Sequence, residues 1–319
     1  MANDLLDQVR NQARFVADHA NTVTVDDSAL RSLAEWLPVD GRGPKIDPSY
    51  YFSGNIDDTI AYVVTFTTMN FGSGWHPYLT KEAGRSGSIT MMFRLRDWYR
   101  RHGPISAAEL VDSTSHFMAE VFGQRLDPPV DELMSLFARA LSDLGQLLIS
   151  RFNGSFADLV EHAGQSVSCL AETLATMPLY QDIAVYRGRK IPIMKRAQIA
   201  SAELAAALGG HPLGHFADLD RLTAFADNLV PHVLRVEGVL CYDPELADRI
   251  DREELLAPGS AQEVEIRANT IVAVEELVAQ IRSRCSGITA AEVGHLLWKM
   301  GQAPHYKSRP RHRCRTTFY

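Results

Sequence analysis

The sequence predicts a mainly α-helical fold, a helical bundle-like single domain over residues 1–319 with at most a small β element. Three observations predict it. Apolar residues recur three and four positions apart over long stretches, helix start and stop signals flank those stretches, and strand-like runs are rare. The composition, 46% hydrophobic and 22% charged, is that of an ordinary globular protein.

Residues 1–45 form the N-terminal part of this prediction, a helical segment separated from the core by a Gly/Pro-rich piece at 39–48. The segment alternates acidic, basic and apolar residues, so it does not resemble a signal peptide. No run in the chain approaches the roughly 18 apolar residues of a membrane span. The widely spaced cysteines favour reduced thiols over a disulfide framework. We therefore expect a cytoplasmic protein with no membrane association.

The clearest helices lie in the middle of the chain. Residues 60–69 are rich in Val, Thr and Tyr and are compatible with either a strand or a buried helix. Leucines and phenylalanines at helical spacing predict a helix from Val130 to Phe152. A further helix follows Pro192 and is expected to end at the glycine pair 209–210.

Two more helix starts follow. Pro231 is expected to open a helix, because proline suits the first turn. The stretch from Ser260 to Glu263 has a capping-box pattern. The helix after it carries one apolar stripe, made of Val264, Ala268, Ile271, Val274, Val278 and Ile281.

A charged residue falls on that stripe. At about 100° per residue, Arg267 lies between stripe positions and Glu275 lies near the other side of the stripe. An unpaired buried charge is costly, so Arg267 either pairs with Glu275, extends past the core to water, or faces a ligand.

The helix after Pro192 carries a second set of charges. Arg196 and Glu203 stand two turns apart on one face, and Lys195 precedes them. This face is either a solvated surface or part of a site. A carboxylate at Glu203 is suited to accept two hydrogen bonds from a guanine-like ring.

Asp227 lies four residues before Pro231. Aspartate is a common helix cap, so a capping role is one interpretation. The other is catalytic, because cleavage of a glycosidic bond needs a fixed negative charge beside an oxocarbenium-like sugar.

Two other segments admit a structural and a functional interpretation. The segment from Asn70 to Trp75 joins aromatic residues through glycines, either as core or as a stacking face for a base. Residues 307–319 contain no acid, and their arginines alternate, as on one side of an extended chain. They form either a solubilising tail or, as the aromatic residues Phe318 and Tyr319 favour, a docked phosphate clamp.

Other classes of function are disfavoured. A net charge of -7 argues against a general polyanion binder, although one local basic cluster still suits a small anion. The chain has no Walker loop, no HExxH and no GxSxG elbow, and its 11 histidines show no metal-ligand spacing. We expect no metal and no cofactor, which favours plain hydrolysis.

Five segments, taken in order, resemble the queuosine-salvage protein family, the queuosine 5'-phosphate N-glycosylases. They are residues 61–75, 180–204, 222–240, 262–277 and 312–319. The resemblance implies a helical fold related to helix-hairpin-helix DNA glycosylases, with a glycosylase-like core at 50–319 and a docked C-terminal tail. It also implies hydrolysis of queuosine 5'-monophosphate to queuine and ribose 5-phosphate, for queuine salvage into tRNA.

This resemblance guides the expected site. Asp227 is the expected catalytic residue. The residues expected to contact the base are Glu203, Phe71, Trp75, Phe225 and Asn70. Those expected to contact phosphate or ribose are Lys195, Arg196, Arg267, His305, Arg313 and Arg315. The expected partner is the small nucleotide alone, with no stable nucleic acid, and the expected state is a monomer.

The chain departs from the family pattern at several positions. Glu203 stands where family members often carry Asp, and Asn228 and Leu229 replace the usual Tyr and Arg. Gly294 stands near the place of an expected acid, with His295 as a replacement contact. The alternatives are a glycosylase acting on a base in DNA or RNA, which needs a basic groove, and a noncatalytic nucleotide-binding protein.

Overall fold

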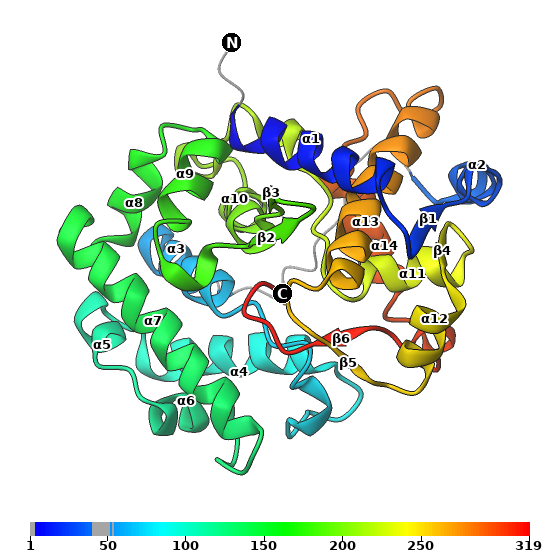
Figure 1. Ribbon diagram of the computed structural model, residues 1–319. Helices are drawn as coiled ribbons and strands as arrows, with labels where there is room; N and C mark the ends of the chain where they lie inside the picture. Colours follow the sequence, from blue (N-terminus) through cyan, green and yellow to red (C-terminus); the bar gives the residue numbers. More distant parts are fainter. Residues whose placement is uncertain (1–3, 40–51, 53) are drawn as a thin grey trace.

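Helices account for most of the chain in the computed structural model, which describes residues 4–39, 52 and 54–319 (Figure 1). The helices of the N-terminal half are α1 (Leu5–Asp18), α2 (Asp27–Trp36), α3 (Ile56–Thr68), α4 (Gly87–His102), α5 (Ala107–Val111), α6 (Ser115–Phe122), α7 (Val130–Phe152) and α8 (Phe156–His162). Those that follow are α9 (Val167–Leu174), α10 (Lys195–Leu208), α11 (Val230–Val236), α12 (Pro244–Asp251), α13 (Ala261–Ile281), α14 (Ala290–Met300) and α15 (Pro304–Lys307).

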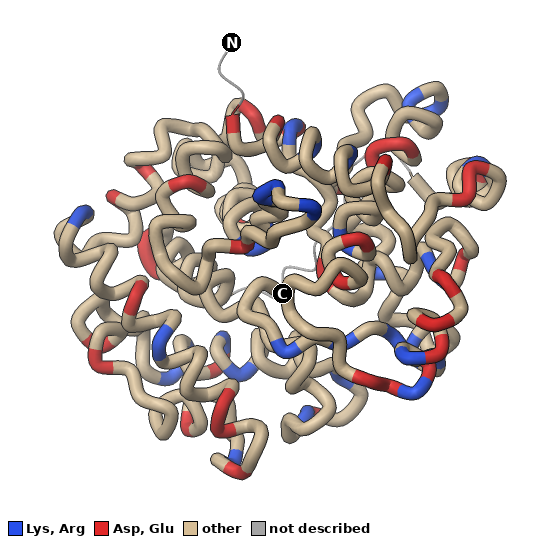
Figure 2. Tube along the Cα trace, in the orientation of Figure 1, with Lys and Arg blue, Asp and Glu red and all other residues tan. Residues whose placement is uncertain are grey.

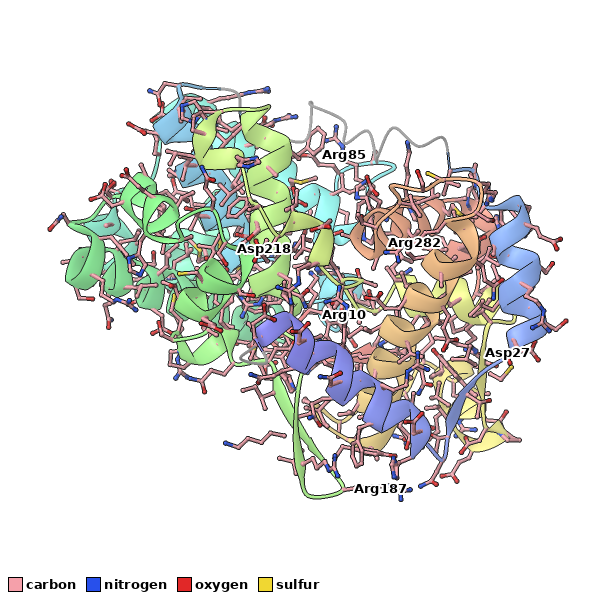
Figure 3. The ribbon with its side chains drawn as sticks, turned by 90° about the horizontal axis from the view of Figure 1, so that it is seen from above. Arg10, Asp27, Arg85, Arg187, Asp218 and Arg282 are labelled. Atoms are coloured by element: carbon pink, nitrogen blue, oxygen red, sulfur yellow. The ribbon has the colours of Figure 1, made fainter. Side chains whose placement is uncertain are left out.

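The strands form three two-stranded sheets within these described ranges. β1 (Val23–Val25) pairs with β4 (Leu240–Tyr242), and β2 (Ile183–Tyr186) pairs with β3 (Arg189–Pro192), both antiparallel. β5 (Leu255–Leu256) pairs in parallel with β6 (Arg313–Cys314). The β2–β3 hairpin projects from the helices, with Arg187 at its tip (Figure 3). The mainly α class with a small β element is thus confirmed.

Most of the predicted helices are present. The helix at 130–152 is confirmed as α7, and α10 ends at Gly209, which adopts a φ of 52°. Residues 60–69 belong almost entirely to helix α3, which decides between the two interpretations of that stretch. Most of the Gly/Pro-rich piece at 39–48 lies outside the described residues, as does the end of the 1–45 segment.

Two hydrophobic cores organise the molecule. The first core joins α1, α3–α10 and one side of α13, and the second core joins α2, α11, α12, α14 and the other side of α13. In Figure 1 the helices α3–α10 fill the left and lower part, and α11, α12 and α14 lie to the right. Because α13 contributes to both cores, it is the element that links them.

Helix α13 is buried on nearly all sides along its first four turns. Ser260 caps it as predicted, accepting a hydrogen bond from Glu263 N (3.4 Å). The Glu263 carboxylate accepts from Gly259 N (3.3 Å), whereas a capping box would have it accept from Ser260. The predicted apolar stripe is buried, but so are the charged residues Glu265 and Arg267, each 1% exposed.

The C-terminal segment is docked against the loop that follows α3. The main-chain oxygen of Tyr319 accepts from Gly72 N (3.0 Å) and Ser73 N (3.4 Å). Gly74 packs so closely on the same segment that a Cβ there would meet Cys314 C at 2.7 Å and Arg315 N at 2.8 Å. The segment is therefore part of the folded body, as the aromatic ending favoured.

Charges are interspersed along the chain. Figure 2 shows Lys and Arg alternating with Asp and Glu over the trace. No helix in the described part of the chain is long and apolar enough to cross a membrane.

Candidate functional site

A cavity of about 150 Å³ lies where the two cores meet. The first core supplies the end of α3, the loop at 69–76, the start of α4 and one face of α10. The loop at 225–230 packs on both cores, the second core supplies part of α14, and the C-terminal segment closes the wall with Arg311 and Tyr319. The cavity thus joins parts of the chain that are far apart in sequence.

Asp227 lies in this wall and also caps a helix. Its Oδ1 accepts hydrogen bonds from Leu229 N (2.7 Å) and Val230 N (3.0 Å), at the start of α11. Pro231 occupies the first turn of that helix, as predicted. The two interpretations of Asp227 are therefore compatible, because the capping contacts hold a cavity-lining carboxylate in place.

Helix α10 presents three residues to the cavity at intervals of four. They are Lys195, Ile199 and Glu203, and the helical rise places the first and last roughly 12 Å apart along the axis. Lys195 Nζ donates to Asn70 O (3.2 Å). Burial lowers the Lys195 pKa to about 8, and the nearby Asp227 carboxylate opposes that shift.

Basic groups gather near Asp227. Arg311 and Lys307 line the cavity with Lys195, and no carboxylate in the described ranges makes an ion pair with any of the three. Burial lowers the pKa of Arg311, and Asp227 opposes the shift. His76 also lines the wall, and its pKa is lowered to about 3 by burial and then by Arg311 and other nearby cations. Such a cluster is suited to an anion.

The start of α4 faces the same cavity. Ser86 caps the helix, accepting from Ile89 N (3.4 Å), and Gly87 and Ser88 line the wall beside it. The first turn of α4 carries no acidic residue, so its main-chain N–H groups and helix dipole also favour an anion.

Aromatic and apolar side chains make up much of the remaining wall. Phe71 and Phe137 meet edge to face with ring centroids 5.0 Å apart. Phe225 packs against the first core and Trp298 against the second. These flat apolar surfaces are suited to a planar base.

Two buried polar atoms of the wall, Ser73 Oγ and Gln302 Oε1, have no hydrogen-bond partner among the described residues. Buried polar groups are rarely left unpaired. Their placement in the wall therefore indicates a polar ligand. No group of three or more His, Cys, Asp or Glu side chains suited to a metal ion occurs among the residues that the structure describes.

Six of the predicted site residues line the cavity: Asp227, Glu203, Phe71, Phe225, Asn70 and Lys195. Two others lie behind its wall. Trp75 is buried and donates through Nε1 to Glu132 (2.8 Å). Arg196 is buried, donates to the main-chain oxygens of Thr68 and Leu179, and lies over the Phe71 ring (4.8 Å).

The remaining four predicted basic contacts also lie outside the cavity lining. Arg267 pairs with Asp182, whereas Glu275, the partner considered from sequence, pairs with Arg10. Figure 3 labels Arg10 on α1. Arg313 and Arg315 are engaged by Glu253 (3.3 Å) and Glu132 (3.7 Å). His305 is exposed on α15. Each of these three arginines lies beside a carboxylate, and none of them lines the cavity.

The structure adds residues that sequence reasoning did not select for the site. Arg311 is one of the alternating arginines, but alternation alone does not distinguish it from its neighbours. The sequence around His76, and from Ser86 to Ser88, shows no residue spacing that is typical of a binding site. The positions that depart from the family pattern, Asn228, Leu229, Gly294 and His295, all line the cavity.

Comparisons with known proteins agree in pointing to one family. The family model "Queuosine salvage protein" matches residues 50–319. The chain is similar to the queuosine 5'-phosphate N-glycosylase/hydrolase of Sphaerobacter thermophilus, with 35% identity covering 98% of this chain and 97% of that protein. It is also similar to the proteins of the same name from Bos taurus (27% identity, 97% and 98% covered) and Schizosaccharomyces pombe (26%, 95% and 94%).

Proposed function

The chain belongs to the queuosine salvage protein family, and from this premise we propose that it hydrolyses the N-glycosidic bond of queuosine 5'-phosphate. The products are queuine, for salvage into tRNA, and ribose 5-phosphate. The observation that carries the proposal is the fixed Asp227 carboxylate. It stands in one cavity with aromatic surfaces and with a group of cations that form no ion pair with a carboxylate in the described ranges.

In this proposal the cavity holds the nucleotide by its chemically distinct parts. The base lies against Phe71 and Phe225, and the Glu203 carboxylate accepts hydrogen bonds from its guanine-like edge. The phosphate is bound by Arg311 and Lys195, with the start of α4 contributing N–H groups. In this proposal Arg311 binds the phosphate, in place of Arg313 and Arg315, which the sequence suggested.

The reaction breaks the bond between ribose C1' and the base nitrogen. The bonding electrons leave with the base, and positive charge develops on the ribose. The base takes up one proton, which is balanced by the proton that the attacking water loses. Asp227 stabilises that charge, and its carboxylate orients the water whose oxygen bonds to C1'. Because Oδ1 is already held by two main-chain N–H groups, the carboxylate does not need to reorganise during the reaction.

We further propose kinship of this fold with helix-hairpin-helix DNA glycosylases, and a cytoplasmic monomer that acts on the mononucleotide without stable binding of nucleic acid. The interspersed charges of Figure 2 support the last point, since a polynucleotide groove needs a broad basic face.

The first prediction tests the carboxylate. In Asp227→Asn the amide oxygen can still accept the two capping hydrogen bonds, so we expect an intact fold and nearly unchanged nucleotide binding. The kcat for queuine release should fall on the order of 10²–10³-fold, because the negative charge is lost. Release of queuine is followed by mass-resolved chromatography, binding by calorimetry and folding by thermal unfolding.

A matched control is Asp243→Asn. Asp243 caps α12 through Oδ1, which accepts from Leu246 N (2.7 Å), and it does not line the cavity. This variant should keep the kcat of the unaltered protein. Binding of the nucleotide without queuine release by the unaltered protein would instead favour a noncatalytic nucleotide-binding protein. A preference for an oligonucleotide over the mononucleotide would favour the nucleic-acid glycosylase.

A further inference from the structure

We propose that the buried ion pair between Arg267 and Asp182 positions Asp227 and Lys195 for the reaction, an inference that rests on the function proposed above. Arg267 Nη1 and Nη2 donate to Asp182 Oδ1 (2.8 Å) and Oδ2 (2.7 Å), a two-pronged geometry that fixes the guanidinium in one plane. Arg267 is 1% exposed and Asp182 4% exposed, and neither lines the cavity.

The ion pair also makes a hydrogen bond to the segment that carries Asp227. Arg267 Nε donates to Ala226 O (3.0 Å), the carbonyl of the residue immediately before Asp227. This hydrogen bond fixes the peptide group that joins Ala226 to Asp227. It therefore fixes the Asp227 Cα, from which the side chain extends. It complements the Leu229 and Val230 N–H groups, which hold the carboxylate at its other end.

A second outward contact reaches Lys195. Asp182 Oδ2 also accepts from Lys195 N (3.1 Å), the first residue of α10. Met194, just before it, adopts a left-handed φ of 55° and gives no side-chain cap. Asp182 therefore satisfies a main-chain donor that the helix itself leaves open, and it fixes the start of the helix whose first side chain faces Asp227.

A third contact reaches the C-terminal wall. The Arg267 guanidinium lies over the Tyr319 ring, 4.7 Å from its centroid. The main-chain oxygen of Tyr319 accepts a hydrogen bond from Gly72 N. Glu263, on the preceding turn of α13, stands 3.5 Å from Arg267 and is a second carboxyl group beside the guanidinium. One buried pair thus touches the supports of three separate parts of the cavity wall.

Stability alone is a weak reason for such a pair. Replacing a buried ion pair by apolar residues of similar volume is often neutral or stabilising, because desolvation of two charges offsets their attraction. What apolar residues cannot provide is directed hydrogen bonds to Ala226 O and Lys195 N. A small displacement of reacting groups costs on the order of 10²-fold in rate. This is the loss expected when those bonds are weakened.

The test compares kcat and KM of Arg267→Lys and Asp182→Asn with those of the unaltered protein, using queuosine 5'-phosphate as substrate. Lysine keeps the charge but loses the forked geometry, and asparagine keeps the shape but loses the charge. We expect kcat to fall on the order of 10²-fold, with KM changed by less than about threefold. A folded variant with the kcat of the unaltered protein, or one with raised KM and unchanged kcat, overturns the inference.

Glu265→Gln is the matched control. Glu265 lies on α13 two residues from Arg267 and is equally buried, and it accepts hydrogen bonds from Thr22 N (2.7 Å) and the Tyr186 hydroxyl (2.8 Å), away from the cavity. Its kcat should match that of the unaltered protein even if the thermal unfolding temperature falls. An equal loss of kcat in this control would show a general effect of disturbing α13 and would also overturn the inference.

A double variant covers the case in which the single variants fail to fold. If the single variants do not fold, the double variant Asp182→Leu, Arg267→Met removes both charges and avoids an unpaired buried one. A folded double variant with low kcat supports positioning, and one with the kcat of the unaltered protein overturns it. Absence of queuine release from the unaltered protein would sink the proposed function itself, which is a separate outcome.

Discussion

At the scale of single residues, the arginines of the C-terminal segment differ by the partners that they meet. Arg313 lies beside Glu253 and Arg315 beside Glu132, whereas Arg311 lines the cavity near Asp227 and makes no ion pair within the described ranges. An arginine already engaged by a carboxylate has less to gain from a phosphate. The partners therefore separate three side chains that the alternating sequence presents as equivalent.

Arg311→Gln should raise the KM for queuosine 5'-phosphate on the order of 10–100-fold, because a charge-assisted hydrogen bond to phosphate contributes about 1.5–3 kcal/mol. The effect on free queuosine, which lacks the phosphate, should be much smaller. Steady-state kinetics on the two substrates give this comparison. Arg313→Gln is the control and should leave both KM values within about twofold; equal losses for both substrates in Arg311→Gln would contradict a phosphate role.

At the scale of elements, α13 shows why sequence periodicity identified the helix but not its surroundings. Its predicted stripe is buried together with Arg267, which falls on that stripe, and so is the side that carries Glu265. A charged residue in sequence suggests a solvated face. Only the fold brings Asp182, 85 positions earlier, to neutralise Arg267. The pairing partner was therefore beyond local reasoning, although the unusual position of Arg267 was visible.

The residues that line the cavity, like the contacts of α13, could be predicted from the sequence only in part. Asp227 and Glu203, candidates that come from recognisable segments of the sequence, both line the cavity. Trp75 was not distinguishable from Phe71 in sequence, because both aromatics flank the same glycines; packing turned one toward Glu132 and the other toward the cavity. The start of α4 was missed because a serine cap by itself carries no sign of what it faces.

Docking of the C-terminal segment depends on an element contact at Gly74. In Gly74→Ala the new Cβ would meet Cys314 C at 2.7 Å and Arg315 N at 2.8 Å, so the backbone of one segment must move. We expect the free energy of unfolding to fall by about 1–3 kcal/mol and the KM for the nucleotide to rise, because Arg311 and Tyr319 are displaced. Urea unfolding and steady-state kinetics measure the two effects.

Gly287→Ala serves as the control for that change. Gly287 is exposed, and a Cβ there meets nothing within 4 Å. Both the free energy of unfolding and the KM should stay close to those of the unaltered protein. If Gly74→Ala also leaves them unchanged, the close approach does not hold the segment in place.

At the scale of the whole molecule, the junction of the two cores buries neutral histidines. His312 is 2% exposed, and neither of its ring nitrogens has a hydrogen-bond partner among the described residues. Burial, with Arg267 and other nearby cations, lowers its pKa to about 3, and the pKa of His76 is lowered similarly. The folded protein therefore resists protonation that the unfolded chain accepts near pH 6.5.

Because the pKa of these histidines is lower in the folded than in the unfolded chain, acid should destabilise the protein. Below about pH 6.5 the unfolded chain binds protons that the folded chain does not, so the free energy of unfolding falls as the pH drops toward 3. Between pH 6.5 and 4.5 the loss is on the order of 2 kcal/mol for each such histidine. We expect His312→Phe to lose less stability over this range than the unaltered protein, in urea unfolding at the two pH values.

The exposed His116 provides the comparison, because His116→Phe removes a surface histidine and keeps the buried His312, so this variant should retain the acid-induced loss that His312 causes. An identical acid-induced loss in His312→Phe and the unaltered protein would contradict the role given to His312.

The docking of the C-terminal segment also has a consequence for local opening of the site. Arg311 and Tyr319 line the cavity, and hydrogen bonds from Gly72 N and Ser73 N to the Tyr319 oxygen hold their segment. No residue of 311–319 belongs to either hydrophobic core. The segment can therefore detach while both cores stay packed, so that anion binding is lost before the protein unfolds.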